Sequence, residues 1–269
     1  MSQFIAALPM YDWPEARVEV DAEWSAIRDR LRAAGIDAPE RLVRRNADMS
    51  PQPDGIRNTA GQRIAADPAT LPPDALDLAT LWRHPRLLLA QTCWGPMELG
   101  LAQDVQVVGQ PDYSPFEGGE GAFYSSTIVM RRTGAGVPAE DRPPPWDGRA
   151  DIPVDLLAGR RLAFNGRDSM SGWLALSRDL AVLRARSGVF SAEQETGGHR
   201  RSIVAVAQGD ADVAALDCRS WALARRFEPA AQELRVVGWT ARRKGLPMVT
   251  SARTSPALVD TLKAVLARR

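Results

Sequence analysis

The strongest chemical signal in the chain is a turn rich in small hydroxyl residues. It spans residues 165–172, NGRDSMSG, and lies between a short apolar run and a segment with helical apolar spacing. Ser169 and Ser171 can cap that helix, where backbone N–H groups lack partners and the helix dipole attracts negative charge. The turn therefore predicts either an anion site or an ordinary serine cap, and the ordinary cap is the commoner of the two.

Two further signals lie at predicted helix starts. The glycines at 197 and 198 precede His199, which is typical of a tight turn that lets a ligand approach the amides, or of a glycine turn with a solvent-facing histidine. Asp217 follows the apolar run 213–216, so it is either a helix cap or a ligand contact. In open α/β sheets ligands lie at the carboxyl ends of strands, so Ser169, His199 and Asp217 can converge there. A carboxylate beside an anion suits a ligand that keeps a proton, such as phosphate or a phosphonate rather than sulfate.

The chain lacks the motifs of the common catalytic and cofactor sites. It has no GxxxxGK[ST], GxSxG, HExxH or CxxC sequence. Ser169, His199 and Asp217 are the residue types of a hydrolytic triad, but a serine that caps a helix is a poor nucleophile. Two histidines exclude a His-rich metal site, and we expect Cys93 and Cys218 to be two buried thiols, with a disulfide as the alternative. We predict no catalytic residue, no metal and no cofactor.

Composition and charge narrow the class of protein. The chain has 269 residues, is 45% hydrophobic and 25% charged, and carries a formal net charge of +1. A near-neutral chain does not favour nucleic acid, and no apolar run is long enough to insert into a membrane. Residues 1–7 lack a basic segment followed by an apolar stretch, and Met1-Ser2-Gln3 is typical of a natural start. This favours a cytoplasmic protein, or a periplasmic one if a signal peptide was removed.

Strand-like and helix-like segments alternate along the chain, which predicts an α/β fold with largely parallel sheets. Asp74 is the expected cap of the second helix, residues 117–121 are an expected loop, and 46–73 and 133–153 are expected irregular excursions. The expected strands are 4–8, 87–90, 105–108, 122–131, 162–164, 213–216 and 234–238. The expected helices are 20–34, 74–82, 93–101, 171–183, 199–208, 218–227 and 256–267.

The order of several short segments resembles a known family. These are YSSTIVMR at 124–131, DLLAGRRLAFN at 155–165, SMSG at 169–172, the Gly-His pair ending at His199, and GDADVAALD at 209–217. The set resembles the phosphate, phosphite and phosphonate substrate-binding proteins of ABC transporters. The resemblance implies the type 2 periplasmic-binding-protein fold, with two α/β lobes and a ligand cleft between them. It places residues 1–127 plus 240–269 in lobe 1, with the final helix, and 128–239 in lobe 2.

The resemblance also implies which residues hold the oxyanion. Ser169, Ser171, His199 and Asp217 would bind it, together with the backbone of Met170, which stands where a hydroxyl residue is frequent in the family. An aromatic contact from lobe 1 falls on Tyr11. Further hydrogen-bond candidates at strand ends are Thr92, Cys93, Tyr124 and the Ser-Ser-Thr run at 125–127.

We therefore expect a monomeric solute-binding protein that closes by a hinge on phosphate or a phosphonate, for transport with an ABC permease or for sensing. One alternative is an enzyme on the same scaffold, either a hydrolase or transferase that uses Ser169 or Cys93, or an enzyme of the thiamine-precursor type. A second alternative is a cytoplasmic regulatory protein with an altered site.

Overall fold

The computed structural model describes residues 3–183 and 188–267, so Met1 and Ser2 of the expected start lie outside the described residues. The chain divides into two compact units, Met1–Gln110 with Leu246–Arg269 (unit 1) and Pro111–Gly245 (unit 2). The family-based boundaries lay at 127/128 and 239/240. Residues 111–127 and 240–245 fall in unit 2 because β6 (Gly119–Glu120), β7 (Phe123–Tyr124) and β13 (Arg243–Lys244) form a three-stranded sheet there.

Unit 1 is built on a four-stranded sheet in the order β1-β4-β14-β5. β1 and β4 are parallel, whereas β14 runs antiparallel to β4 and β5. Successive side chains alternate between the faces, so Ile5 and Ala7 join one core cluster while Ala6 and Leu8 join the other. The strands are β1 (Ile5–Ala7), β4 (Leu87–Gln91), β5 (Val105–Gly109) and β14 (Met248–Ser251).

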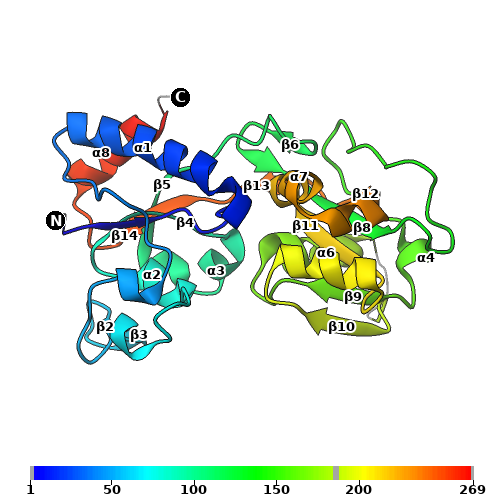
Figure 1. Cartoon of the computed structure of the whole chain (residues 1–269), viewed down its shortest axis with the longest axis horizontal. Helices are drawn as coiled ribbons and strands as arrows, with labels where there is room; N and C mark the ends of the chain where they lie inside the picture. The colour runs from blue at the N-terminus through cyan, green and yellow to red at the C-terminus, as the bar shows by residue number, and fades with distance from the viewer. Residues whose placement is uncertain (1–2, 184–187, 268–269) are drawn as a thin grey trace. The chain divides into compact units, whose positions relative to one another are not determined.

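Helices cover both faces of this sheet (Figure 1). α1 (Arg17–Ala33) and α8 (Pro256–Ala267) pack on one face, and α1 contributes Trp24, Ile27 and Leu31 at the helical spacing that the sequence shows. α2 (Leu78–Arg83) and α3 (Trp94–Glu98) pack on the other face. Short 3-10 turns complete the unit: η1 (Pro14–Ala16), η2 (Asn46–Asp48), η3 (Pro68–Thr70) and η4 (Leu101–Gln103).

Two sequence expectations for unit 1 were wrong in detail. The excursion 46–73 is not irregular throughout, because β2 (Ile56–Arg57) and β3 (Arg63–Ala65) form an antiparallel pair. The second helix is capped by Asp77 and not by Asp74. The Asp77 Oδ1 atom accepts a hydrogen bond of 2.7 Å from the Thr80 N–H, whereas Asp74 is 88% exposed. Both aspartates precede the same apolar run, so the sequence alone does not choose between them.

Unit 2 is built on a five-stranded sheet in the order β10-β9-β11-β8-β12. β10, β9 and β11 are parallel, but β8 runs antiparallel to both β11 and β12. The prediction of largely parallel sheets was therefore wrong, since residue periodicity carries no information on strand direction. The strands are β8 (Ser126–Arg131), β9 (Arg161–Phe164), β10 (Ala192–Glu195), β11 (Val213–Asp217) and β12 (Leu234–Trp239).

The predicted strand 122–131 is interrupted at Ser125. The Ser125 N–H donates to the Gly118 carbonyl at 2.8 Å. β7 therefore belongs to the three-stranded sheet with β6 and β13, and β8 begins at Ser126. The expected loop 117–121 likewise contains the short strand β6.

Three helices of unit 2 begin where strands of this sheet end. η5 (Met170–Leu174) continues into α5 (Ala175–Val182) after β9, α6 (His199–Gln208) follows β10, and α7 (Cys218–Phe227) follows β11 (Figure 1). α6 and α7 have the predicted bounds, and Gly209 ends α6 at φ 88°. The unit also contains α4 (Val154–Leu157) and η6 (Pro229–Glu233).

The proline-rich segment 133–153 runs along the free edge of β12. Arg142 N–H donates to the Val236 carbonyl at 2.9 Å, and Asp141 Oδ1 accepts from the Val236 N–H at 2.9 Å. Further along, Asp151 and Trp239 exchange two backbone hydrogen bonds. This segment therefore covers a sheet edge that would otherwise present unpaired backbone groups.

Within 3–183 and 188–267, no helix has the length and apolar character needed to cross a bilayer. The same residues contain no group of three or more His, Cys, Asp and Glu side chains placed to hold a metal ion.

The helix cap of α2 gives a direct test of this part of the fold. Asp77→Ala should lower the free energy of unfolding by about 1 kcal/mol, because the Thr80 N–H loses its acceptor. Asp74→Ala is the matched control and should change stability by less than about 0.5 kcal/mol. Urea denaturation followed by tryptophan fluorescence measures both variants. Equal effects of the two substitutions would contradict the assignment of the cap.

Candidate functional site

The hydroxyl-rich turn after β9 forms a wide helix start. Ser169 has an extended backbone and its Oγ accepts a hydrogen bond of 3.1 Å from the Gly172 N–H, so it is the cap. The Ser169 carbonyl accepts from the N–H groups of both Trp173 and Leu174, at 3.2 and 3.0 Å, which gives the first turn its π-helical width. Ser171 lies inside this turn, and its Oγ is 3.4 Å from that of Ser169.

His199 is the first residue of α6. The backbone reaches it through Gly197, whose φ of 78° is the left-handed conformation that favours glycine, and through Gly198, which is extended. The backbone angles therefore favour a glycine at Gly197 but not at Gly198. This turn brings the imidazole of His199 to the same end of the sheet as the serine turn.

Asp217 ends β11 and caps α7. Its Oδ1 atom accepts a hydrogen bond of 2.9 Å from the Ser220 N–H. Its Oδ2 atom lies 3.3 Å from His199 Nε2. Asp217 is therefore the cap of α7 and also a neighbour of the His199 ring.

The side chains of Ser171 and Asp217 meet at one ring nitrogen of His199. Nε2 lies 2.9 Å from Ser171 Oγ and 3.3 Å from Asp217 Oδ2, while Nδ1 is buried and has no hydrogen-bond partner among the described residues. A carboxylate only accepts, so we assign the proton to Nε2. Burial lowers the pKa of His199, and the negative charge of Asp217 opposes this only in part. The ring is accordingly neutral at pH 7, with a bare Nδ1.

This geometry differs from that of a serine-hydrolase relay. In such a relay the serine uses one ring nitrogen and the acid holds the other. Here Ser171 and Asp217 share Nε2, and Ser169 contacts the histidine through no hydrogen bond. Burial and the nearby Asp217 strongly raise the pKa of the Cys218 thiol, so it stays protonated and is a poor nucleophile.

Within unit 2, the structure brings four of the predicted site residues together. This group in unit 2 consists of Ser169, Ser171, His199 and Asp217. Tyr124, also in unit 2, is buried and stacks on Tyr113 with ring centroids 5.2 Å apart. The sulfur of Met170 is 3.8 Å from an Arg178 nitrogen.

The remaining predicted site residues, Tyr11, Thr92 and Cys93, belong to unit 1. Thr92 follows β4, and its buried Oγ1 has no hydrogen-bond partner in the described parts of the chain. Cys93 precedes α3, and no disulfide joins it to Cys218, so two buried thiols were predicted correctly. Tyr11, which follows β1, is also buried.

Two further polar residues lie near this group, Ser126 opposite Asp217 and Thr240 next to Ser126. Ser126 is directly opposite Asp217 in the antiparallel pairing of β8 and β11, and its buried Oγ has no partner among the described residues. Thr240 holds Ser126 in place, since its Oγ1 accepts from the Ser126 N–H at 2.8 Å and its N–H donates to the Ser126 carbonyl at 2.9 Å. The polar run at 125–127 marked the first of these in the sequence, but nothing marked Thr240.

Comparisons with known proteins identify the family and agree with the fold. The two α/β units have the architecture of type 2 periplasmic binding proteins, which is the class that the fold defines. Residues 98–268 match the family model described as the phosphonate periplasmic substrate-binding protein of ABC transporters. The chain belongs to this family, as its short segments indicated. No curated protein sequence matches it.

Solved structures share the fold at low sequence identity. PhnD1 from Prochlorococcus marinus, in complex with methylphosphonate, has a TM-score of 0.61 and 14% identity over 98% of this chain and 84% of that chain. A binding protein component of an ABC phosphonate transporter from Pseudomonas aeruginosa has a TM-score of 0.62 and 12% identity over 98% and 74%. XAC2383 from Xanthomonas citri, bound to chloride ion, has a TM-score of 0.58 and 17% identity over 98% and 82%.

The serine turn should not tolerate a larger residue at Gly172. A Cβ there would collide with Oδ1 of Asn165. Gly172→Ala should therefore lower the free energy of unfolding by about 1–3 kcal/mol, as overpacking does elsewhere. Gly198→Ala is the control, since a Cβ at that position meets nothing within 4 Å. Combining Gly172→Ala with Asn165→Ala should recover part of the loss in urea denaturation; no recovery would contradict the proposed collision.

The two histidines predict how stability depends on pH. Burial lowers the pKa of both His84 and His199, so near pH 6.5 the unfolded chain binds protons that the folded chain does not. The free energy of unfolding should therefore fall as the pH drops below about 6.5. Arg161 lowers the pKa of Asp212 to about 2, so protonation of this carboxylate lowers the free energy of unfolding only in more acidic solution.

Denaturation at about pH 7.5 and about pH 5.5 separates these contributions. His199→Gln should show a smaller drop between the two pH values than the unsubstituted protein, and His84→Gln tests the second histidine in the same way. A drop that is unchanged in His199→Gln would contradict a buried neutral imidazole.

Proposed function

We propose that this chain is a solute-binding protein whose unit 2 binds the oxyanion of phosphate or a phosphonate. The observation that carries the proposal is the convergence of two serine hydroxyls, one neutral imidazole and one carboxylate at the ends of β9, β10 and β11. Family membership supports the same role, because the family model describes phosphonate substrate-binding proteins.

The site is suited to an anion although it contains a carboxylate. Three helix starts, those of η5 with α5, α6 and α7, lie at the strand ends and present partial positive charge to a ligand there. The hydroxyls of Ser169 and Ser171 can donate to ligand oxygens. Asp217 can only accept, so it favours a ligand oxygen that carries a proton. Phosphate and phosphonate monoanions have such an oxygen near neutral pH, and sulfate does not.

Other predicted contacts extend this proposal. Five more residues stay predicted ligand contacts: Met170 through its backbone and Tyr124 in unit 2, and Tyr11, Thr92 and Cys93 in unit 1. A ligand cleft between two lobes also stays a prediction. We propose an ABC permease as the protein partner, since the family serves such transporters. A monomeric state, the division into lobes at 127/128 and 239/240, and the location in the cell stay predictions too.

Isothermal titration calorimetry with methylphosphonate, phosphate and sulfate tests the proposal. Ser171→Ala should weaken methylphosphonate binding by about 1.5–3 kcal/mol, the usual contribution of a hydrogen bond to a charged group. Asp217→Asn replaces an acceptor with a side chain that can also donate, so the preference for methylphosphonate over sulfate should fall by at least about tenfold. Ser191→Ala, an exposed serine of unit 2, is the control.

Two results would overturn the proposal. One is the absence of binding of any of the three anions to protein that has been unfolded and refolded to remove retained ligand. The other is an unchanged ratio of methylphosphonate to sulfate affinity in Asp217→Asn, which would remove the selective role of the carboxylate.

A further inference from the structure

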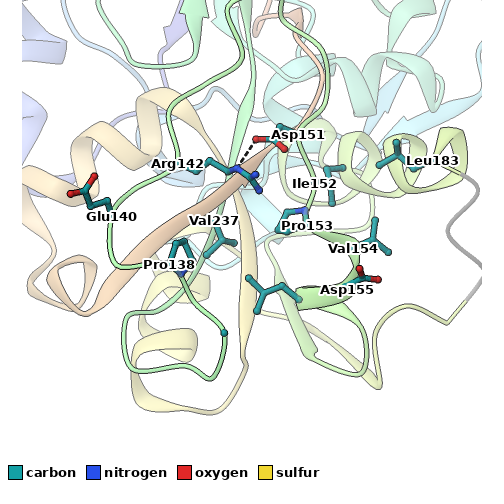
Figure 2. A pocket seen from close by; sticks show the side chains of 12 residues that line it. Pro138, Glu140, Arg142, Asp151, Ile152, Pro153, Val154, Asp155, Leu183 and Val237 are labelled. Carbon is teal, nitrogen blue, oxygen red and sulfur yellow. Dashed lines mark ion pairs between the residues drawn. The ribbon is translucent and has the colours of Figure 1, made fainter.

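Unit 2 has a second hollow that shares no residue with the site around His199. It is a groove of about 790 Å³ between the segment 133–153 and α4 (Figure 2). This volume lies within the range of roughly 300–1,000 Å³ that small-molecule sites occupy. Nothing in the proposed binding of an oxyanion uses this groove.

The floor of the groove is apolar. Figure 2 shows Pro138 and Val237 in its middle, with Ile152, Pro153 and Val154 beside them. Val237 comes from β12, and the prolines come from the segment that covers this strand, so the floor rests on the sheet. Such a surface favours methylene groups over water.

The rim of the groove is acidic. Arg142 is the one guanidinium among the described lining residues, and it lies 2.8 Å from Asp151, which neutralises it. Glu140 and Asp155 are exposed, and no described residue forms an ion pair or a side-chain hydrogen bond with either carboxylate. Figure 2 shows these two side chains on opposite sides of the apolar floor. Among the described residues that line it, the groove therefore carries two negative charges without an ion-pair partner, with an apolar surface between them.

We propose that this groove binds an aliphatic diamine or a longer oligoamine. The methylene chain would lie on the apolar floor, and one ammonium group would pair with Glu140 while the other pairs with Asp155. A monoamine can satisfy only one of the two carboxylates, and the negative rim repels anions. The ligand class is thus set by two features together, the apolar surface and the placement of the two free charges.

Calorimetry with 1,6-diaminohexane, 1-aminohexane and 1,6-hexanediol tests the ligand class. The diamine should bind most tightly, the monoamine roughly threefold to fivefold more weakly, and the neutral diol at least about tenfold more weakly. Raising the salt concentration to about 0.5 M should weaken diamine binding several-fold, because exposed charges are screened. Equal binding of the diol and the diamine would overturn the proposal, as would no heat with the diamine at low salt.

A pair of double variants tests the location. Glu140→Gln with Asp155→Asn should weaken diamine binding by about tenfold. The matched control, Glu233→Gln with Asp260→Asn, removes two exposed carboxylates outside the groove and should leave diamine binding unchanged. An equal loss in both double variants would show only non-specific attraction and overturn the assignment. Methylphosphonate titrated into the same proteins reports separately on the oxyanion site.

Discussion

The contact of one imidazole nitrogen with two different partners is the constraint on which the site of unit 2 depends. His199 Nε2 reaches the hydroxyl of Ser171 and the carboxylate of Asp217, and these come from three separate connections after β9, β10 and β11. Only the parallel arrangement of these strands places all three connections at one sheet edge. The sharing of Nε2 leaves Nδ1 without a partner, which is unfavourable in a buried ring unless another molecule uses it.

The antiparallel strand β8 adds a second constraint at the same edge. It pairs with β11 so that Ser126 stands opposite Asp217, and Thr240 from the end of β12 binds the backbone of Ser126 on both sides. The edge of β12 is in turn covered by the segment 133–153. The proline-rich segment thus protects the sheet that carries the proposed oxyanion site, and the same covering forms one side of the acidic groove.

Much of the fold could be predicted from the sequence where helix caps and apolar spacing indicate the same element. α6 and α7 begin and end at the predicted residues, because the apolar spacing is regular and the ends carry clear signals: Gly198 and Gly209 flank α6, Asp217 caps α7, and Pro229 follows α7. Ser169, Ser171, His199 and Asp217 were singled out together from helix starts after strands and from the family resemblance, and the structure places them near one another. That they lie within hydrogen-bonding distance of one another required the structure, since spacing along the chain does not give distances across a sheet.

The predictions failed where tertiary contacts decide. β10 (Ala192–Glu195) is an exposed, polar edge strand without the apolar alternation that would mark it, and it was missed. β8 and β14 run against their neighbours, and no residue pattern encodes that direction. Asp77 rather than Asp74 caps α2 because its side chain reaches the Thr80 N–H, although both residues precede the helix.

Nitrogen NMR of protein labelled with ¹⁵N-histidine tests the central claim most directly, because the chain has only two histidines. In His84 both ring nitrogens have partners, with Ser50 near one and the Arg86 N–H at the other. We expect free His199 to be neutral with its proton on Nε2, and we expect methylphosphonate to shift its ring resonances while those of His84 stay in place. Ring resonances of His199 that do not respond to saturating methylphosphonate would contradict an oxyanion site built around this imidazole.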